Sequence, residues 1–230
     1  HRCGAELHAC GAFVSPPLNK PLVYESTLRQ LIRHRVTDGR IPYHIPAGGS
    51  STHGIAGYVN AGLELAGQVT ANILPAPDVI YVACGTLGTA AGMVLGLKTA
   101  GLRSRVIAVK VTTGPHVNTA NMRKCIQSTN RFLHDLDPSF PLFAFSRDEF
   151  EVCEGYSGPR YALFTDAGMS AVRQMWRNER LRLEGTYTGK TCAALLDDVR
   201  DGRLQGMTVL FWNTFNSRDF STEIEGIDYH

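Results

Sequence analysis

A cluster of small and hydroxyl-bearing residues follows a short apolar run near the middle of the chain. Val79 to Ala83 is a β-branched run typical of a buried parallel strand, and Ala90 to Ala100 has the apolar spacing of a helix. A strand that turns into a helix start presents unpaired N–H groups and the positive end of the helix dipole, which suit a phosphate or carboxylate. The same spacing also fits a tight turn without a ligand. The residues of the turn are Gly85, Thr86, Gly88 and Thr89.

This turn matches neither of the two common phosphate-binding loops. A Walker loop ends in Gly-Lys-Ser/Thr, and no lysine occurs between Gly85 and Gly96. A dinucleotide fingerprint has the spacing G-x-G-x-x-G and an acidic residue about 20 residues further on. Here the glycines stand at 85, 88 and 92, and the next apolar run, Val106 to Val111, carries Lys110 near its end. ATP and NAD are therefore disfavoured as ligands, whereas a small phosphorylated ligand is still compatible with the turn.

The cysteines indicate free thiols rather than a metal site or a disulfide framework. They stand at 3, 10, 84, 125, 153 and 192, without a C-x-x-C pair or a Cys/His cluster of zinc spacing. Free thiols are typical of a reducing compartment, so we expect a cytoplasmic protein without a structural metal. Cys84 lies beside the glycine turn, and the alternative is a nucleophile whose pKa the helix start lowers. No histidine stands near it in the sequence.

Composition excludes several classes of partner. The 230 residues are 43% hydrophobic and 19% charged, as in ordinary globular domains. A net charge of +2 gives no strong field for nucleic acid or an acidic membrane surface. No apolar run reaches the roughly 18 residues that cross a bilayer. We therefore expect no nucleic-acid or membrane partner.

Helical and strand patterns alternate along the chain, which predicts an α/β domain with a largely parallel sheet. In such sheets ligands bind at the carboxyl ends of the strands. The segments 48–51, 85–89 and 214–217 each follow an expected strand, so all three could converge on one site. Helices are expected at 24–36, 54–71, 90–100, 118–133, 166–181 and 189–200, and strands at 42–45, 79–83, 106–111 and 209–214, with a further short strand within residues 1–14.

Four segments, taken together and in order, resemble the D-cysteine desulfhydrase and 1-aminocyclopropane-1-carboxylate deaminase family. They are IPAGGSSTHGIAGYVNAGLEL (45–65), ACGTLGTAAGMVLGLK (83–98), GTYTGKTCAALL (185–196) and VLFWNTFN (209–216). The resemblance implies pyridoxal phosphate as cofactor and the tryptophan-synthase-β fold, a three-layer α/β structure with helices on both faces of a twisted, mostly parallel sheet. It also implies a homodimer that acts on a small amino acid. Residues 1–44 would be a remnant of the small domain with the crossover, and 45–230 the large domain that binds the cofactor phosphate.

The resemblance also implies roles for individual residues. The phosphate would be held by the turn Gly85, Thr86, Leu87, Gly88 and Thr89. Tyr187 would lie against the pyridine ring, Thr188 would face the ring nitrogen, and Thr214 would lie beside the ring. Tyr156 matches a family position near the substrate, which makes Tyr187 and Tyr156 the candidate catalytic residues. Without the resemblance, both tyrosines read as ordinary half-buried aromatics, and Thr188 reads as a helix N-cap.

Thr188 carries chemical information about the reaction. A carboxylate facing the pyridine nitrogen keeps it protonated and makes the ring a strong electron sink, whereas a hydroxyl favours a weaker sink. The deaminase branch of the family has Tyr-Glu-Gly-Lys at this point, and this chain has Tyr-Thr-Gly-Lys, as the desulfhydrase branch does. The resemblance therefore favours α,β-elimination from a small amino acid, giving a 2-oxo acid and ammonia, over cyclopropane ring opening.

The family's Schiff-base lysine has no counterpart in these 230 residues. In the family it belongs to an upstream Gly-Asn-Lys-x-Arg-Lys motif, whereas the lysines here are Lys20, Lys98, Lys110, Lys124 and Lys190. We therefore expect a fragment that lacks the catalytic lysine and is inactive alone, with Lys190 as the nearest substitute in the sequence. The alternative is a non-catalytic α/β domain that binds a phosphorylated metabolite or a partner chain.

Overall fold

The computed structural model describes residues 20–146 and 148–216. They fall into two compact units that divide between His44 and Ile45. The first unit contains the helix α2 (Lys20–Thr37), and the second contains every other helix and strand described below. The division falls where the sequence placed the boundary between a small-domain remnant and the large domain, although that assignment of the two parts stays a prediction. Over the described residues, no helix has the length and apolar character needed to cross a membrane.

One predicted strand is wrong. Residues 41–46 form neither helix nor strand. The segment is bounded by Pro42 and Pro46, which lack the N–H that a strand donates to its neighbour. The strand predicted within residues 1–14 lies outside the described residues.

The second unit is built on a four-stranded parallel sheet of order β3-β2-β1-β4. The strands are β1 (Val79–Cys84), β2 (Arg105–Lys110), β3 (Phe150–Cys153) and β4 (Val209–Trp212). In register, Val82 of β1 lies opposite Ala108 of β2 and Trp212 of β4. The edge strand β3 was not predicted, because its four residues include the charged Glu151 and make no apolar run.

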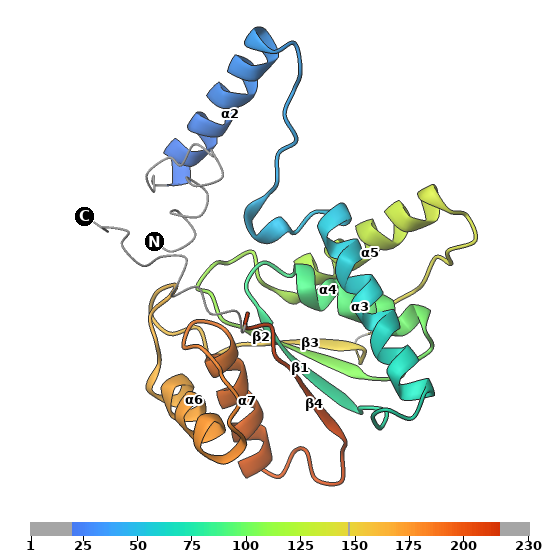
Figure 1. Cartoon of the computed structure of the whole chain (residues 1–230), viewed down its shortest axis with the longest axis vertical. Coiled ribbons are helices and arrows are strands. Elements are labelled where there is room, and N and C mark those ends of the chain that lie inside the picture. Colours follow the sequence, from blue (N-terminus) through green and yellow to red (C-terminus); the bar gives the residue numbers. More distant parts are fainter. Residues whose placement is uncertain (1–19, 147, 217–230) are drawn as a thin grey trace. The chain divides into compact units, whose positions relative to one another are not determined.

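Helices cover both faces of this sheet (Figure 1). On one face lie α3 (Thr52–Thr70), α4 (Gly88–Thr99) and α5 (Thr119–Leu136), and on the other lie α6 (Asp166–Glu179) and α7 (Thr188–Arg200). Alternate residues of the strands point to opposite faces of the sheet. Ile80 and Val82 pack with α3 and α4, whereas Val79 and Tyr81 pack with Ala194 of α7. This is the predicted three-layer α/β architecture.

Glycines allow α3 and α4 to cross in close contact. A Cβ built on Gly96 would lie 2.2 Å from the carbonyl oxygen of Val59, and one on Gly62 would lie 2.9 Å from the Cα of Gly96. Closer to its start, α4 meets α3 again, where a Cβ on Gly92 would lie 2.5 Å from that of Tyr58. This crossing brings the start of α3, and the 3-10 turn η1 (Ala47–Gly49) before it, to the start of α4.

Side-chain caps fix where several helices begin. Ser51 caps α3 by accepting the N–H of Gly54 at 3.3 Å, and Asn118 caps α5 by accepting that of Asn121 at 2.9 Å. Thr165 accepts the N–H of Gly168 at 3.1 Å and caps α6. The sequence therefore placed most helix starts within about two residues, the usual uncertainty of such boundaries.

Candidate functional site

The strand order of the sheet reverses beside β1. Strands β1, β2 and β3 follow one another toward one edge, and the chain then returns to place β4 on the other side of β1. Ligands of open α/β sheets bind at the carboxyl ends of the strands at such a point. The turn from Gly85 to Leu87 leaves β1 there, and Thr214 follows β4 at the same edge, exposed to solvent.

The turn after β1 is held in a strained conformation by a buried side chain. Leu87 adopts a left-handed backbone with φ of +75°, which costs a residue other than glycine about 1 kcal/mol or more. Its side chain is 5% exposed and packs into the core beneath α4. The side chain thus anchors the turn from below, and only the backbone of Leu87 is left to contact a ligand.

The N-terminus of α4 is open. No described side chain caps this helix, and its first intrahelical bond is donated by Ala91 to the carbonyl of Leu87 at 2.9 Å. The amides of Gly88, Thr89 and Ala90 precede that bond and have no partner within the helix. Three unpaired amides at the positive end of a helix dipole suit a phosphate group.

A second segment lies beside this helix start. The hydroxyl of Ser50 donates to Oγ1 of Thr86 at 2.8 Å, so the proton of the Thr86 hydroxyl stays available to a ligand. A Cβ built on Gly48 would lie 2.2 Å from Thr86 Oγ1, and one on Gly88 would lie 2.7 Å from Ser50 Oγ. Two of the three segments that the sequence expected to converge, 48–51 and 85–89, therefore form one cradle that side chains at these glycines would fill.

The N-terminus of α7, in contrast, is closed by a side chain of this chain. The carboxylate of Glu184 accepts the backbone N–H groups of Thr186 at 2.6 Å and of Tyr187 and Thr188 at 2.7 Å each. An internal anion already fills the position that a phosphate would take at this helix. Of these two helix starts, α4 is the one that can receive an external phosphate.

Tyr187 lies next to the cradle. A Cβ built on Gly85 would lie 3.2 Å from Cε1 of Tyr187, so the ring packs directly against the first residue of the turn. Its hydroxyl meets the hydroxyl of Tyr161, and the two rings are edge to face with centroids 6.2 Å apart. Burial, followed by the hydrogen bond with Tyr161, raises the pKa of Tyr187, so the phenol stays protonated at neutral pH.

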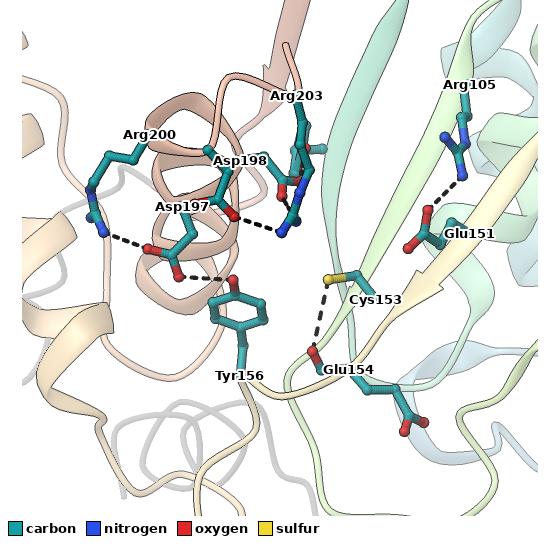
Figure 2. Close-up of polar contacts among 11 residues, drawn as sticks. Arg105, Glu151, Cys153, Glu154, Tyr156, Asp197, Asp198, Arg200 and Arg203 are labelled. Atoms are coloured by element: carbon teal, nitrogen blue, oxygen red, sulfur yellow. Dashed lines mark hydrogen bonds and ion pairs between the residues drawn. The ribbon is translucent and has the colours of Figure 1, made fainter.

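Tyr156 is engaged elsewhere. Its hydroxyl donates to Oδ2 of Asp197 on α7 at 2.9 Å, and Asp197 in turn pairs with Arg200 (Figure 2). Burial and the bond to Asp197 raise the pKa of Tyr156. The structure therefore turns this predicted catalytic hydroxyl toward α7 and brings Tyr161, which the sequence did not single out, to Tyr187.

Thr188 lies in the first turn of α7, and its hydroxyl is turned back onto Glu184. Oγ1 accepts the backbone N–H of Glu184 at 3.0 Å and donates to the carboxylate of Glu184 at 3.2 Å. The residue is 1% exposed. Thr188 is not the N-cap that its position in the sequence suggested, because the carboxylate of Glu184 caps the helix instead. Its single hydroxyl proton is committed to Glu184.

Of the lysine side chains that the structure describes, three are bonded to other groups and one is exposed. Nζ of Lys190 is buried and donates to the carbonyl of Ser157 at 2.7 Å, and burial lowers its pKa. Lys98 pairs with Glu149, and Lys110 pairs with Glu154 at 2.9 Å. The amine of Lys124 extends from an exposed position of α5. The side chain of Lys20 lies outside the described residues.

Among the described residues, the thiols supply neither a nucleophile nor a metal centre at this edge. The cysteines in the described part, Cys84, Cys125, Cys153 and Cys192, are all free, as predicted, and Cys3 and Cys10 lie outside it. Burial raises the pKa of Cys84 to about 12, which outweighs the backbone N–H of Leu87 that lowers it. Within residues 20–146 and 148–216, no group of three or more His, Cys, Asp or Glu side chains is placed to hold a metal ion.

A cavity of about 540 Å³ lies at the opposite, amino edge of the sheet. Asp78, Arg105 and Glu149, at the starts of three strands, help to line it. None of the predicted site residues lines this cavity, so it is separate from the cradle at the start of α4.

Four site residues escaped the sequence analysis. Ser50 lies within a segment that was expected to converge, but nothing in the sequence paired it with Thr86. Glu184 and Tyr161 are four and 26 residues from the groups they contact. His116 follows β2, and its Nε2 lies 3.3 Å from the carbonyl oxygen of Gly85. Among these, only the spacing of Glu184 before Thr188 gives a local signal, that of an acid just before a helix start.

The comparisons with known proteins point to one family of enzymes. The model of the family described as pyridoxal-phosphate dependent enzyme matches residues 2–214. D-cysteine desulfhydrases of Yersinia pestis (strain Pestoides F) and Yersinia pseudotuberculosis serotype O:1b (strain IP 31758) are each 30% identical over 182 residues, 79% of this chain and 51% of theirs. The crystal structure of an ACC deaminase homologue is similar with a TM-score of 0.67 and 27% identity, over 87% of this chain and 56% of that one. The chain thus spans about half the length of the curated relatives it matches.

The residues present fit the cofactor of that family. The open amides of α4 and the Thr86 hydroxyl suit its phosphate, and the Tyr187 ring, packed against the bare Cα of Gly85, lies beside them. The fold, the cradle and a family match across nearly the whole sequence therefore lead to one conclusion: this chain belongs to the pyridoxal-phosphate dependent enzymes.

Proposed function

We propose that this chain forms the cofactor-binding part of a lyase that acts on a small amino acid by α,β-elimination, with D-cysteine as the substrate that its similarity to the desulfhydrases suggests. The observation that carries the proposal is the open start of α4 beneath Ser50, with the ring of Tyr187 packed against Gly85. It supplies a phosphate cradle and an aromatic surface at one edge of the sheet.

Each residue of the site has a task that its contacts support. The amides of Gly88 and Thr89 and the hydroxyl of Thr86 bind the phosphate, and Leu87 anchors the turn. When bound, pyridoxal phosphate supplies an electron sink for bonds at the amino acid's α-carbon. Between them, the hydroxyls of Tyr161 and Tyr187 carry two protons and need one for their mutual bond, which leaves one to donate to a substrate or leaving group.

We further propose that the amine required for catalysis comes from outside these 230 residues. The Lys190 amine is committed to the Ser157 carbonyl, and those of Lys98 and Lys110 are committed to ion pairs. The same observation favours a second candidate function, a domain without a Schiff-base lysine that holds a phosphorylated metabolite without catalysis. The free thiols of the described cysteines support a reducing compartment, which we propose to be the cytoplasm.

The phosphate cradle can be tested by binding. We expect the protein to bind pyridoxal 5′-phosphate at least about tenfold more tightly than pyridoxal, which lacks the dianion that α4 receives. Thr86→Val removes one donor from the cradle and should weaken pyridoxal 5′-phosphate binding about tenfold. Thr99→Val is the matched control, because Thr99 lies at the far end of α4 and bonds only its own helix, to Leu95. Quenching of tryptophan fluorescence gives the dissociation constants. Equal affinities for the two compounds, or equal effects of the two variants, would exclude the cradle as the phosphate site.

The role of the lysines is tested by borohydride reduction of the protein mixed with pyridoxal 5′-phosphate, followed by mass spectrometry of its peptides. We expect no reduced adduct on Lys190 and no sulfide released from D-cysteine by the 230-residue protein. An adduct on Lys190 together with sulfide release would show that this chain supplies its own amine. A longer protein that adds the relatives' remaining half and still releases no sulfide would instead favour the non-catalytic function.

A further inference from the structure

We propose that Glu184 is a positioning residue, whose carboxylate closes the N-terminus of α7 and so holds the ring of Tyr187 in place against Gly85. The inference rests on the proposed function, because it concerns how the pyridine ring of the cofactor is received. Glu184 lies in the segment between α6 and α7, four residues before Thr188, and is partly buried.

The carboxylate of Glu184 provides the N-terminal cap that α7 otherwise lacks. The N-cap residue of α7 is Tyr187, whose phenolic side chain makes no capping bond. Oε1 of Glu184 accepts the N–H groups of both Tyr187 and Thr188, and Oε2 accepts that of Thr186. Hydrogen bonds to a charged acceptor are worth more than neutral ones, and removing the acceptor leaves amides uncompensated at the positive end of the helix.

The backbone of Glu184 is tied to the same helix turn. Its carbonyl accepts the N–H of Gly189 at 2.8 Å, and its N–H donates to Oγ1 of Thr188 at 3.0 Å. Residues 184–189 therefore close on themselves through backbone and side-chain bonds together. Tyr187 lies inside this closed segment with φ of −120° and ψ of −71°, outside the helical range, so its conformation depends on these bonds.

The position of the Tyr187 ring follows from this backbone. The ring reaches Gly85 and the hydroxyl of Tyr161 from a Cα that Glu184 holds on both sides. The phosphate cradle, in contrast, is made by η1, the Gly85 turn and α4, with no contribution from Glu184. A change at Glu184 should therefore disturb the reception of the ring and leave the reception of the phosphate intact.

This separation defines the experiment. Glu184→Gln keeps the shape of the side chain and one acceptor oxygen, but loses the charge and the second acceptor. We expect it to weaken pyridoxal 5′-phosphate binding about tenfold, and to change the affinity for inorganic phosphate, measured by competition, by less than about twofold. Glu179→Gln, an exposed acid at the end of α6, is the matched control and should change neither affinity.

A double-mutant cycle identifies the group through which Glu184 acts. With the ring removed by Tyr187→Ala, the further change Glu184→Gln should alter pyridoxal 5′-phosphate binding by less than about twofold, because the two changes then remove the same interaction. Additive effects would overturn the proposal. So would an unchanged affinity in Glu184→Gln, or an equal loss of both ligands with a lowered melting temperature, which marks a purely structural role. A wild-type protein that does not prefer pyridoxal 5′-phosphate to pyridoxal would instead contradict the proposed function itself.

Discussion

At the scale of single residues, burial can reverse the reactivity that a residue's position in the sequence suggests. Cys84 ends β1, directly before a glycine turn and a helix start, a place that lowers a thiol's pKa when the thiol is accessible. The side chain instead points into the core and is 2% exposed. Desolvation of the thiolate then dominates, and the pKa rises from 9.0 to about 12.

We therefore predict that Cys84 is inert toward thiol reagents in the folded protein. At pH 8 the thiolate fraction falls about a thousandfold when the pKa rises by three units, before any loss of access is counted. Reaction with Ellman's reagent should show no fast phase that Cys84→Ser removes, whereas in urea wild type should release one more equivalent than the variant. A fast native phase absent from Cys84→Ser would refute the prediction.

The same shift predicts how stability depends on pH. The pKa of Cys84 is higher in the folded than in the unfolded protein, so its contribution to the free energy of unfolding is fully present below pH 9 and is lost as the pH rises toward about 12. Wild type should lose more of its unfolding free energy between pH 8 and pH 10.5 than Cys84→Ala does, as measured by urea titration. Parallel losses in the two proteins would contradict the assigned cause.

At the scale of helices and strands, the crossing of α3 and α4 positions the phosphate cradle. Three glycines, Gly62, Gly92 and Gly96, let the two backbones approach within van der Waals contact. The start of α3 then carries Ser50 to the turn at Gly85, although 36 residues separate Ser50 from Thr86. The helices were predicted from their own periodicity. Their contact was not, because it depends on glycines, which carry no side chain and so add nothing to the hydrophobic pattern of the sequence.

Two substitutions to alanine should therefore have opposite effects. Gly96→Ala places a methyl group 2.2 Å from the Val59 carbonyl and should destabilise the protein by about 1–3 kcal/mol. Gly57→Ala, on an exposed position of α3 with nothing within 4 Å of its Cβ, should stabilise it by about 0.5–1 kcal/mol. Urea unfolding measures both. Equal effects of the two substitutions would show that α3 and α4 do not cross at Gly96.

At the scale of the whole molecule, the described residues form two compact units, and the complete sheet with its covering helices belongs to the second. The segment before Ile45 that joins them has neither helix nor strand, and its residues from Gly39 to Ile45 are exposed. The cradle and both tyrosines of the proposed site lie in the second unit. That unit should therefore keep its fold when the connection is cut.

Limited proteolysis tests this division. Trypsin should cleave first after Arg40, in the exposed connection, and leave a resistant product that begins at Ile41 and still binds pyridoxal 5′-phosphate. Mass spectrometry identifies the first cut, and Arg40→Gln should delay it. An earlier cut between Ile45 and Asn216, or a product that unfolds once released, would contradict the prediction.

The sequence by itself determined the class of fold, the position of most helices and the glycine turn after β1, because these depend on local periodicity and on residues adjacent in the chain. It missed β3, whose four residues form a strand only because β2 offers a parallel edge, and it misplaced a strand at 42–45 that has no such neighbour.

Only the tertiary structure decided which side chains meet. It joined Tyr161 to Tyr187 across 26 residues, turned Tyr156 toward Asp197, and gave the capping of α7 to Glu184 rather than Thr188. Local pattern supplies the residue types and the elements that carry them. The partner of each hydroxyl is set by the packing of segments distant in sequence, because a buried polar group must find its acceptor wherever the fold has placed one.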